Sequence, residues 1–98
     1  MGRALAGKVA VVTGASKGGI GTGIAERFAA EGAKVALAAR TRSGLEEALA
    51  LVEAAGSTGG VYVVDLSRPD GGRETLIADV ERDLGPVDVM VNNSALGG

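Results

Sequence analysis

A glycine-rich loop between a predicted strand and a predicted helix constrains this chain more than any other feature. Residues 9–12, before the loop, form a short apolar run rich in β-branched side chains, typical of a strand buried on both faces of a parallel sheet. From Ile20 onward, apolar side chains recur at helical spacing until Gly32, which is a common stop signal. Glycines at such a junction let the backbone turn tightly, and the helix N-terminus attracts negative charge. The loop therefore predicts a phosphate-binding turn.

The rest of the sequence alternates strand-like and helix-like segments. Apolar runs recur at residues 34–39, 61–64 and 87–91, whereas residues 45–52 and 76–84 repeat apolar side chains at helical spacing. The order is βαβαβαβ, which predicts an α/β fold with a parallel sheet and right-handed crossovers. The loop thus sits inside a βαβ unit, which is the context that a dinucleotide-binding turn requires.

Several motifs, in this order, resemble those of the short-chain dehydrogenase/reductase family, the NAD(P)-dependent oxidoreductases that include the ketoacyl-carrier-protein reductases. Thr13–Gly21 is similar to the family's Thr-Gly-x-x-x-Gly-x-Gly loop but has one residue more, so either Gly18 or Gly19 is the additional glycine. Val64–Ser67 resembles the strand end whose Asp contacts the adenine ring. Val87–Ala95 resembles the fourth strand with its Asn-Asn-Ala-Gly motif.

The resemblance implies a Rossmann-type fold of three layers around a doubly wound parallel sheet, here partial, with four strands in the order 3-2-1-4. Residues 1–98 are expected to form one NAD(P)-binding half-domain that is truncated before the catalytic half. Sheets of this kind bind ligands at the carboxyl ends of their strands, where the strand order reverses. The cofactor is therefore expected in the crevice between the first and the fourth strand.

The glycine loop supplies the first group of candidate site residues. We assign the phosphate cradle to Gly14, Gly19 and Gly21, with Gly18 as a rival for the middle position and simple turn geometry as the alternative role. By resemblance, the backbone of Ile20 lies along the pyrophosphate.

The ends of the third and fourth strands supply the second group. The resemblance implies that Asp65 accepts from the adenine amino group and that Asn92 contacts the ribose region; the alternatives are helix or turn capping for Asp65 and turn formation for Asn92. Ser94 stands at a position where the sequence departs from the family motif. The full set of predicted cofactor-binding residues is Gly14, Ser16, Lys17, Gly19, Ile20, Gly21, Arg40, Asp65, Leu66, Asn92 and Ser94.

The end of the second strand predicts which dinucleotide is preferred. An enzyme specific for NAD usually has an acidic side chain there to bind the ribose 2′-hydroxyl, whereas a cation accommodates the 2′-phosphate of NADP. Here Ala39 occupies the acidic position, Arg40 follows it, and Lys17 adds a cation from the loop. We therefore expect a preference for NADP(H), with NAD(H) possible; the alternative is that both cations are solvated surface residues.

Composition excludes several classes of protein. The 98 residues contain no Cys and no His, which rules out disulfides, thiolate chemistry and the commonest general base. The net charge of −2 gives no general polyanion-binding surface, so nucleic acid is not an expected partner. No apolar run approaches the length of a membrane span, and we expect a cytoplasmic protein that binds no membrane and is a homo-oligomer in its full-length form.

By resemblance, the protein's function is hydride transfer between the nicotinamide and a small carbonyl or alcohol substrate. The family's catalytic Tyr-x-x-x-Lys is absent from this sequence, because Tyr62 is followed four residues later by Leu66. We expect Tyr62 to be a partly buried strand residue and the chain alone to be inactive, with no catalytic residue and no metal site. A non-catalytic nucleotide-binding or interaction module remains the alternative. A nucleoside triphosphatase is disfavoured because Thr22-Gly23 stands where its phosphate loop needs a Lys and then Ser or Thr.

Overall fold

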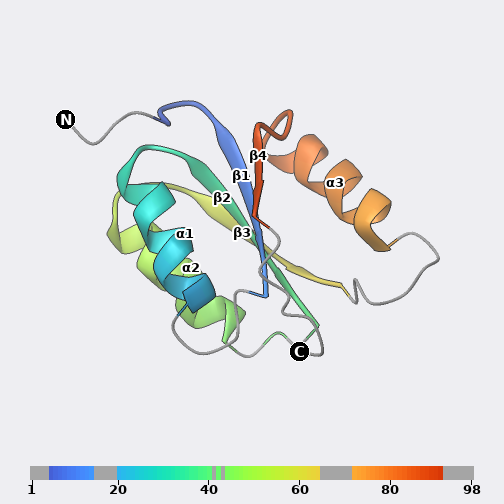
Figure 1. Cartoon of the computed structure of the whole chain (residues 1–98), viewed down its shortest axis with the longest axis horizontal. Coiled ribbons are helices and arrows are strands. Elements are labelled where there is room, and N and C mark those ends of the chain that lie inside the picture. Colours follow the sequence, from blue (N-terminus) through green and yellow to red (C-terminus); the bar gives the residue numbers. More distant parts are fainter. Residues whose placement is uncertain (1–4, 15–19, 41, 43, 65–71, 92–98) are drawn as a thin grey trace.

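The computed structural model describes residues 5–14, 20–40, 42, 44–64 and 72–91, which form an α/β fold around one parallel sheet. Its elements, in chain order, are β1 (Val9–Thr13), α1 (Ile20–Ala30), β2 (Lys34–Ala39), α2 (Leu45–Ala54), β3 (Gly59–Val63), α3 (Gly72–Asp83) and β4 (Val89–Val91). The strand order is β3-β2-β1-β4, which confirms the predicted order 3-2-1-4. α1 and α2 cover one face of the sheet and α3 covers the other, so the chain has the three layers expected (Figure 1).

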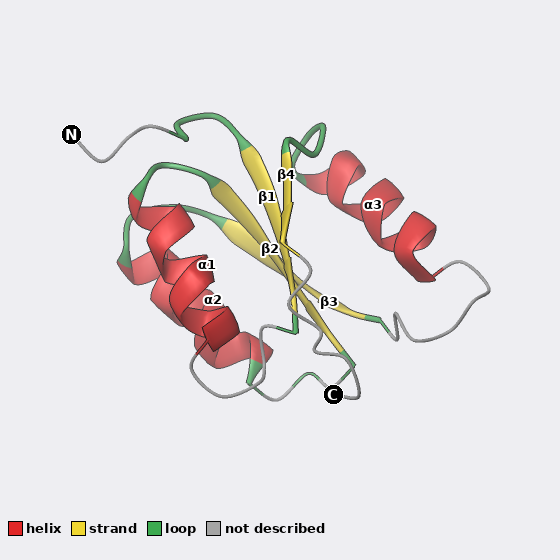
Figure 2. Cartoon of the chain, viewed as in Figure 1, coloured by secondary structure: helices red, strands yellow, loops and turns green. Residues whose placement is uncertain are grey.

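β1 lies at the centre of the core, and all of its residues are buried. β2 pairs with one of its edges and β4 with the other, while helices cover both faces of the sheet (Figure 2). Because successive strand side chains point to opposite faces, Ala10 and Val12 pack on the α1–α2 side, whereas Val9 and Val11 pack on the α3 side. The nearly continuous apolar run is therefore explained by burial on both faces.

Small side chains form much of the α1–α2 face. Ala25 and Ala29 of α1 and Ala48 of α2 are buried against the sheet, together with the larger Leu45 and Val52. Alanine at these positions lets the helix backbones lie close to the strands, as expected for a chain with only two aromatic residues.

The α3 face depends on fewer helix side chains. Leu76 and Val80 are the buried residues of α3, and they pack against Val9, Val11, Ala36 and Ala38. Burying a side chain of this size contributes about 1.5–3 kcal/mol. Half-buried side chains such as Met90 complete the contact, so α3 is attached through a small apolar patch.

β3 begins two residues earlier than the sequence pattern predicted, at Gly59 instead of Val61. Gly59 pairs with Val35, and a Cβ on Gly59 would overlap the Val35 carbonyl oxygen. Gly60 pairs with Ala36 in the same ladder. The two glycines therefore belong to the strand. At Gly59 the strand lies too close to β2 for a side chain.

β4 begins two residues later than predicted, at Val89 instead of Val87. The reason is Asp88, whose carboxylate takes the place of a backbone carbonyl as the acceptor for the Val9 N–H. The third helix, expected from the apolar spacing over residues 76–84, is α3, which spans Gly72–Asp83.

Candidate cofactor-binding site

The carboxyl ends of β1 and β4 are joined at the point where the strand order reverses. Thr13, the last residue of β1, is buried, and its Oγ1 donates a hydrogen bond of 3.2 Å to the carbonyl oxygen of Val91, the last residue of β4. The β1 chain then returns through α1 to β2, on the other side of β1. Thr13 therefore fixes the relative position of the two strands that flank the predicted crevice.

Gly14, the first residue after β1, and the start of α1 are the described parts of the predicted phosphate loop. Gly14 has a φ of +68°, in the left-handed region that residues with a Cβ rarely adopt. Ile20 and Gly21 lie in the first turn of α1, which contains no acidic residue. The N–H groups of that turn lack acceptors within the helix, so this end of α1 has the donors and the positive dipole end that a phosphate needs.

The other predicted residues of the glycine loop and of the later strand ends cannot be placed. Arg40 is described in full, and Gly14, Ile20 and Gly21 are described through their backbones. Outside the described residues lie Ser16, Lys17, Gly18, Gly19, Asp65, Leu66, Asn92 and Ser94. The described part of the candidate site therefore consists of Gly14, the first turn of α1, the end of β4 and Arg40 after β2.

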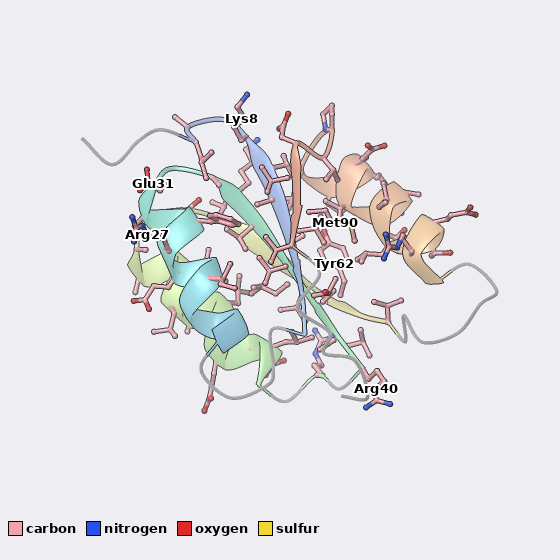
Figure 3. All side chains as sticks on the ribbon, viewed as in Figure 1. Lys8, Arg27, Glu31, Arg40, Tyr62 and Met90 are labelled. Carbon is pink, nitrogen blue, oxygen red and sulfur yellow. The ribbon has the colours of Figure 1, made fainter. Side chains whose placement is uncertain are left out.

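The end of β2 carries an exposed cation. Ala39 is half-buried at the last position of the strand, and Arg40 follows it and is exposed. Figure 3 shows the Arg40 side chain projecting from the end of β2, far from the Arg27–Glu31 pair at the opposite end of the sheet. Within the described part of the chain Arg40 forms no ion pair.

A second arginine at this edge was missed by the sequence analysis. Arg42 lies two residues beyond Arg40, and its Nε is 3.0 Å from Oε2 of Glu46 in the first turn of α2. Both side chains are well exposed, at 65% and 68%. The signal was present in the sequence, since an Arg followed four residues later by a Glu at a helix start is a common ion-pair spacing.

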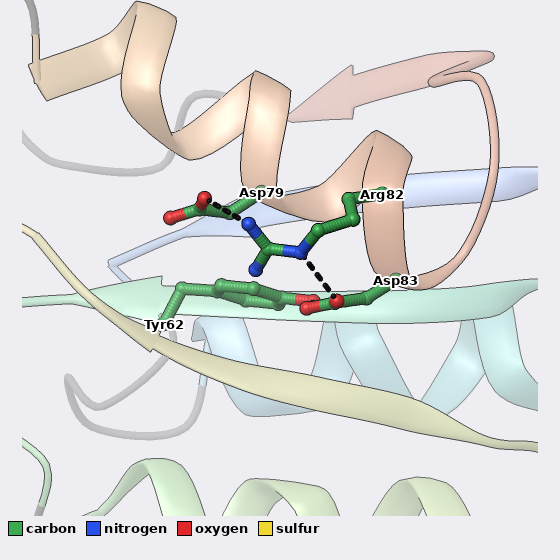
Figure 4. Close-up of polar contacts among 4 residues, drawn as sticks. All are labelled: Tyr62, Asp79, Arg82 and Asp83. Carbon is green, nitrogen blue, oxygen red and sulfur yellow. Dashed lines mark hydrogen bonds and ion pairs between the residues drawn. The ribbon is translucent and has the colours of Figure 1, made fainter.

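Tyr62 lies in a polar cluster away from this edge. Its hydroxyl donates a hydrogen bond of 2.9 Å to Asp83 Oδ2, and Arg82 links Asp83 to Asp79 (Figure 4). Partial burial, followed by the bond to Asp83, raises the pKa of Tyr62 to about 12. The bonds to Tyr62 and Arg82 lower the pKa of Asp83. Tyr62 thus joins β3 to α3, and its half-buried position agrees with the structural role predicted for it.

The described residues show neither a metal-binding cluster nor a membrane-spanning helix. They contain no group of three or more acidic, His or Cys side chains placed to hold a metal ion. They also contain no helix that is long and apolar enough to cross a membrane.

Comparison with known proteins decides the family. The sequence profile of the short chain dehydrogenases matches residues 8–98, which is nearly the whole chain. The chain belongs to this family. It corresponds to the N-terminal portion of the short-chain dehydrogenase fold, in agreement with the motif order and with the strand order β3-β2-β1-β4.

Individual members show the extent of the match. The chain is 38% identical over 90 residues to the 3-oxoacyl-acyl-carrier-protein reductase of Escherichia coli, covering 92% of this chain and 35% of the reductase. The L-sorbose reductase of Gluconobacter frateurii, solved with NADPH and L-sorbose, superposes with a TM-score of 0.85 at 40% identity, covering 100% of this chain and 37% of that one. An NAD⁺-bound xylitol dehydrogenase superposes with a TM-score of 0.87 at 37% identity, over 96% and 35% of the two chains. The chain therefore spans about a third of the length of these short-chain dehydrogenases.

Proposed function

We propose that residues 1–98 are the NADP(H)-binding half-domain of an oxidoreductase that transfers hydride between the nicotinamide and a carbonyl or alcohol substrate. Membership of the short-chain dehydrogenase family supports the dinucleotide as ligand. Relatives of similar identity carry different dinucleotides, NADPH in the sorbose reductase and NAD⁺ in the xylitol dehydrogenase. The choice between them must therefore rest on this chain's own residues.

The exposed Arg40 after β2 is the observation that carries the preference for NADP(H). A guanidinium binds a phosphate through paired, charge-assisted hydrogen bonds, and Arg40 has no competing ion pair among the described residues. Ala39, at the position where a carboxylate would bind a ribose 2′-hydroxyl, supplies neither that acceptor nor a charge that repels phosphate. Lys17 is proposed as a second cation from the glycine loop.

Binding of the pyrophosphate is proposed at the β1–α1 turn. Gly14 has a φ that favours glycine, and the N–H groups of the first turn of α1 donate to the phosphate oxygens. Thr13 holds the end of β1 against the end of β4 beside this turn. When bound, the nicotinamide supplies or accepts the hydride.

Proton transfer to the substrate is not assigned to any residue of this chain. Tyr62 has its hydroxyl engaged by Asp83 at the α3 side of the sheet, and its pKa of about 12 makes it a poor acid–base group near neutral pH. We propose that the 98 residues bind the dinucleotide but do not by themselves reduce a carbonyl compound.

Calorimetric titration of the chain with NADP⁺ and NAD⁺ tests this function. We expect NADP⁺ to bind more tightly by about tenfold or more, since charge-assisted bonds to phosphate contribute about 1.5–3 kcal/mol each before screening. Arg40→Ala should remove most of that difference. The matched control is Arg27→Ala, which removes the same charge from an exposed position at the opposite end of the sheet. Equal affinities in the unmodified chain, or equal effects of the two variants, would refute the assignment of Arg40.

A further inference from the structure

Two carboxylates follow, in the sequence, the cations that the proposed NADP(H) site would use. Glu46 and Glu47 lie in the first turn of α2, directly after the segment that carries Arg40 and Arg42. The two positive charges of this edge are thus matched by two negative ones. A 2′-phosphate that approaches Arg40 meets a surface whose attraction is partly cancelled.

Arg42 is the cation that forms an ion pair with one of these carboxylates. Its Nε–Oε2 distance of 3.0 Å to Glu46 is that of a hydrogen-bonded ion pair, and the Arg42 carbonyl accepts the N–H of Leu45 at 3.0 Å. The second bond ties the backbone of Arg42 to the start of α2. Arg42 is therefore held at the start of α2, two residues after Arg40, and its side chain is paired with the helix.

We propose that Glu46 limits the affinity of this site for the 2′-phosphate by competing for Arg42. This inference rests on the proposed binding of NADP(H) at the end of β2. The competition is weak enough to be reversed by a ligand, because both side chains are more than three-fifths exposed and an exposed ion pair is worth little. A phosphate dianion attracts the same guanidinium more strongly than one carboxylate does, and it accepts paired bonds. Arg42 then joins Arg40 on the phosphate and releases Glu46.

Glu47 offers a matched control for the charge of Glu46. It lies in the same helical turn and is also exposed, but among the described residues it forms no ion pair with Arg42. Glu46→Gln and Glu47→Gln remove the same charge from adjacent positions. A general electrostatic effect would make the two variants similar, whereas competition for Arg42 would separate them.

The test uses two small probes that differ by the 2′-phosphate alone, adenosine 2′,5′-bisphosphate and adenosine 5′-phosphate. Their dissociation constants are measured by calorimetry for the unmodified chain and for Glu46→Gln, Glu47→Gln, Arg42→Ala and Arg42→Ala with Glu46→Gln. We expect Glu46→Gln to tighten the bisphosphate about two- to fivefold, the range of an exposed ion pair, and to leave the monophosphate unchanged. Glu47→Gln should change the bisphosphate less, and Glu46→Gln should have no effect once Arg42 is Ala.

Three results would overturn the inference while leaving the proposed function intact. They are an unchanged or weaker affinity of Glu46→Gln for the bisphosphate, an equal gain in Glu47→Gln, or a gain that persists without Arg42. Equal affinity of the unmodified chain for the two probes would instead refute the proposed preference for NADP(H), and the inference with it. Circular dichroism of each variant establishes that the fold is retained.

Discussion

Asp88 and Val9 are joined by two hydrogen bonds at the amino ends of β4 and β1. The backbone N–H of Asp88 donates to the Val9 carbonyl oxygen at 2.9 Å, and the Val9 N–H donates to the Asp88 carboxylate, also at 2.9 Å. Thr13 makes the corresponding link at the carboxyl ends, to Val91. β4 has only three residues, so side-chain bonds beyond the regular ladder hold both of its ends to β1.

Replacing Asp88 with Ala should destabilise the fold. Val9 is only 2% exposed, so its N–H would lose its acceptor in a site that water reaches poorly. Leaving a buried donor unsatisfied costs about 1–3 kcal/mol, and urea denaturation followed by circular dichroism measures the difference.

Asp88→Asn is the informative companion variant. Its amide oxygen can still accept the Val9 N–H, so we expect it to retain most of the stability that Asp88→Ala loses. If the two variants unfold at the same urea concentration as the unmodified chain, the bond between Asp88 and Val9 contributes nothing to the attachment of β4.

Two glycine substitutions should act in opposite directions. Gly59→Ala places a Cβ against the Val35 backbone inside the β2–β3 ladder, and overlap of this kind costs about 1–3 kcal/mol or more. Gly23→Ala places a Cβ in open space on the exposed side of α1, where alanine is favoured over glycine by about 0.5–1 kcal/mol. In thermal unfolding, Gly59→Ala should therefore lower the melting temperature and Gly23→Ala should raise it. A melting temperature for Gly59→Ala at or above that of the unmodified chain would contradict the close pairing of β3 with β2.

The Tyr62–Asp83 bond predicts a loss of stability at alkaline pH. The folded chain raises the pKa of Tyr62 to about 12, so the protonated phenol is favoured by folding. Its contribution is complete below the ordinary Tyr pKa of about 10 and disappears as the pH rises from there to about 12. The free energy of unfolding of the unmodified chain should therefore fall over this window more steeply than that of Tyr62→Phe. Parallel pH profiles would mean that the hydroxyl is not linked to folding.

The fold could be predicted from the sequence because its signals are local. The apolar run of β1, the helical spacing in α1 and the alternation of the later segments each follow from burial on one or two faces. The strand order followed from the family resemblance and not from the pattern, since periodicity shows which face is buried but not which strand is the neighbour. The bounds of β3 and β4 were wrong because they depend on the Gly59 and Asp88 contacts across strands.

The positions of Gly14 and Arg40 at strand ends could be predicted from the sequence, whereas their roles in binding stay predictions. Gly14 has a positive φ, and Arg40 is exposed, which fits both a phosphate ligand and a solvated surface cation. The Arg42–Glu46 pair was not anticipated, although its spacing is visible in the sequence. The roles of Lys17 and Asp65 stay predictions, since these residues lie outside the described part of the chain.

Amide chemical shifts measured by NMR during titration with NADP⁺ test most directly whether a dinucleotide binds at the carboxyl ends of the strands, beside β1 and its neighbours. We expect saturable shifts at Gly14, Gly21 and Arg40, with little change at Tyr62 and Asp83 on the α3 side of the sheet. NAD⁺ should shift Gly14 and Gly21 but move Arg40 less, because it lacks the 2′-phosphate. No saturable shift with either dinucleotide, or shifts centred on Tyr62 and Asp83, would contradict binding of a dinucleotide at the carboxyl ends of the strands.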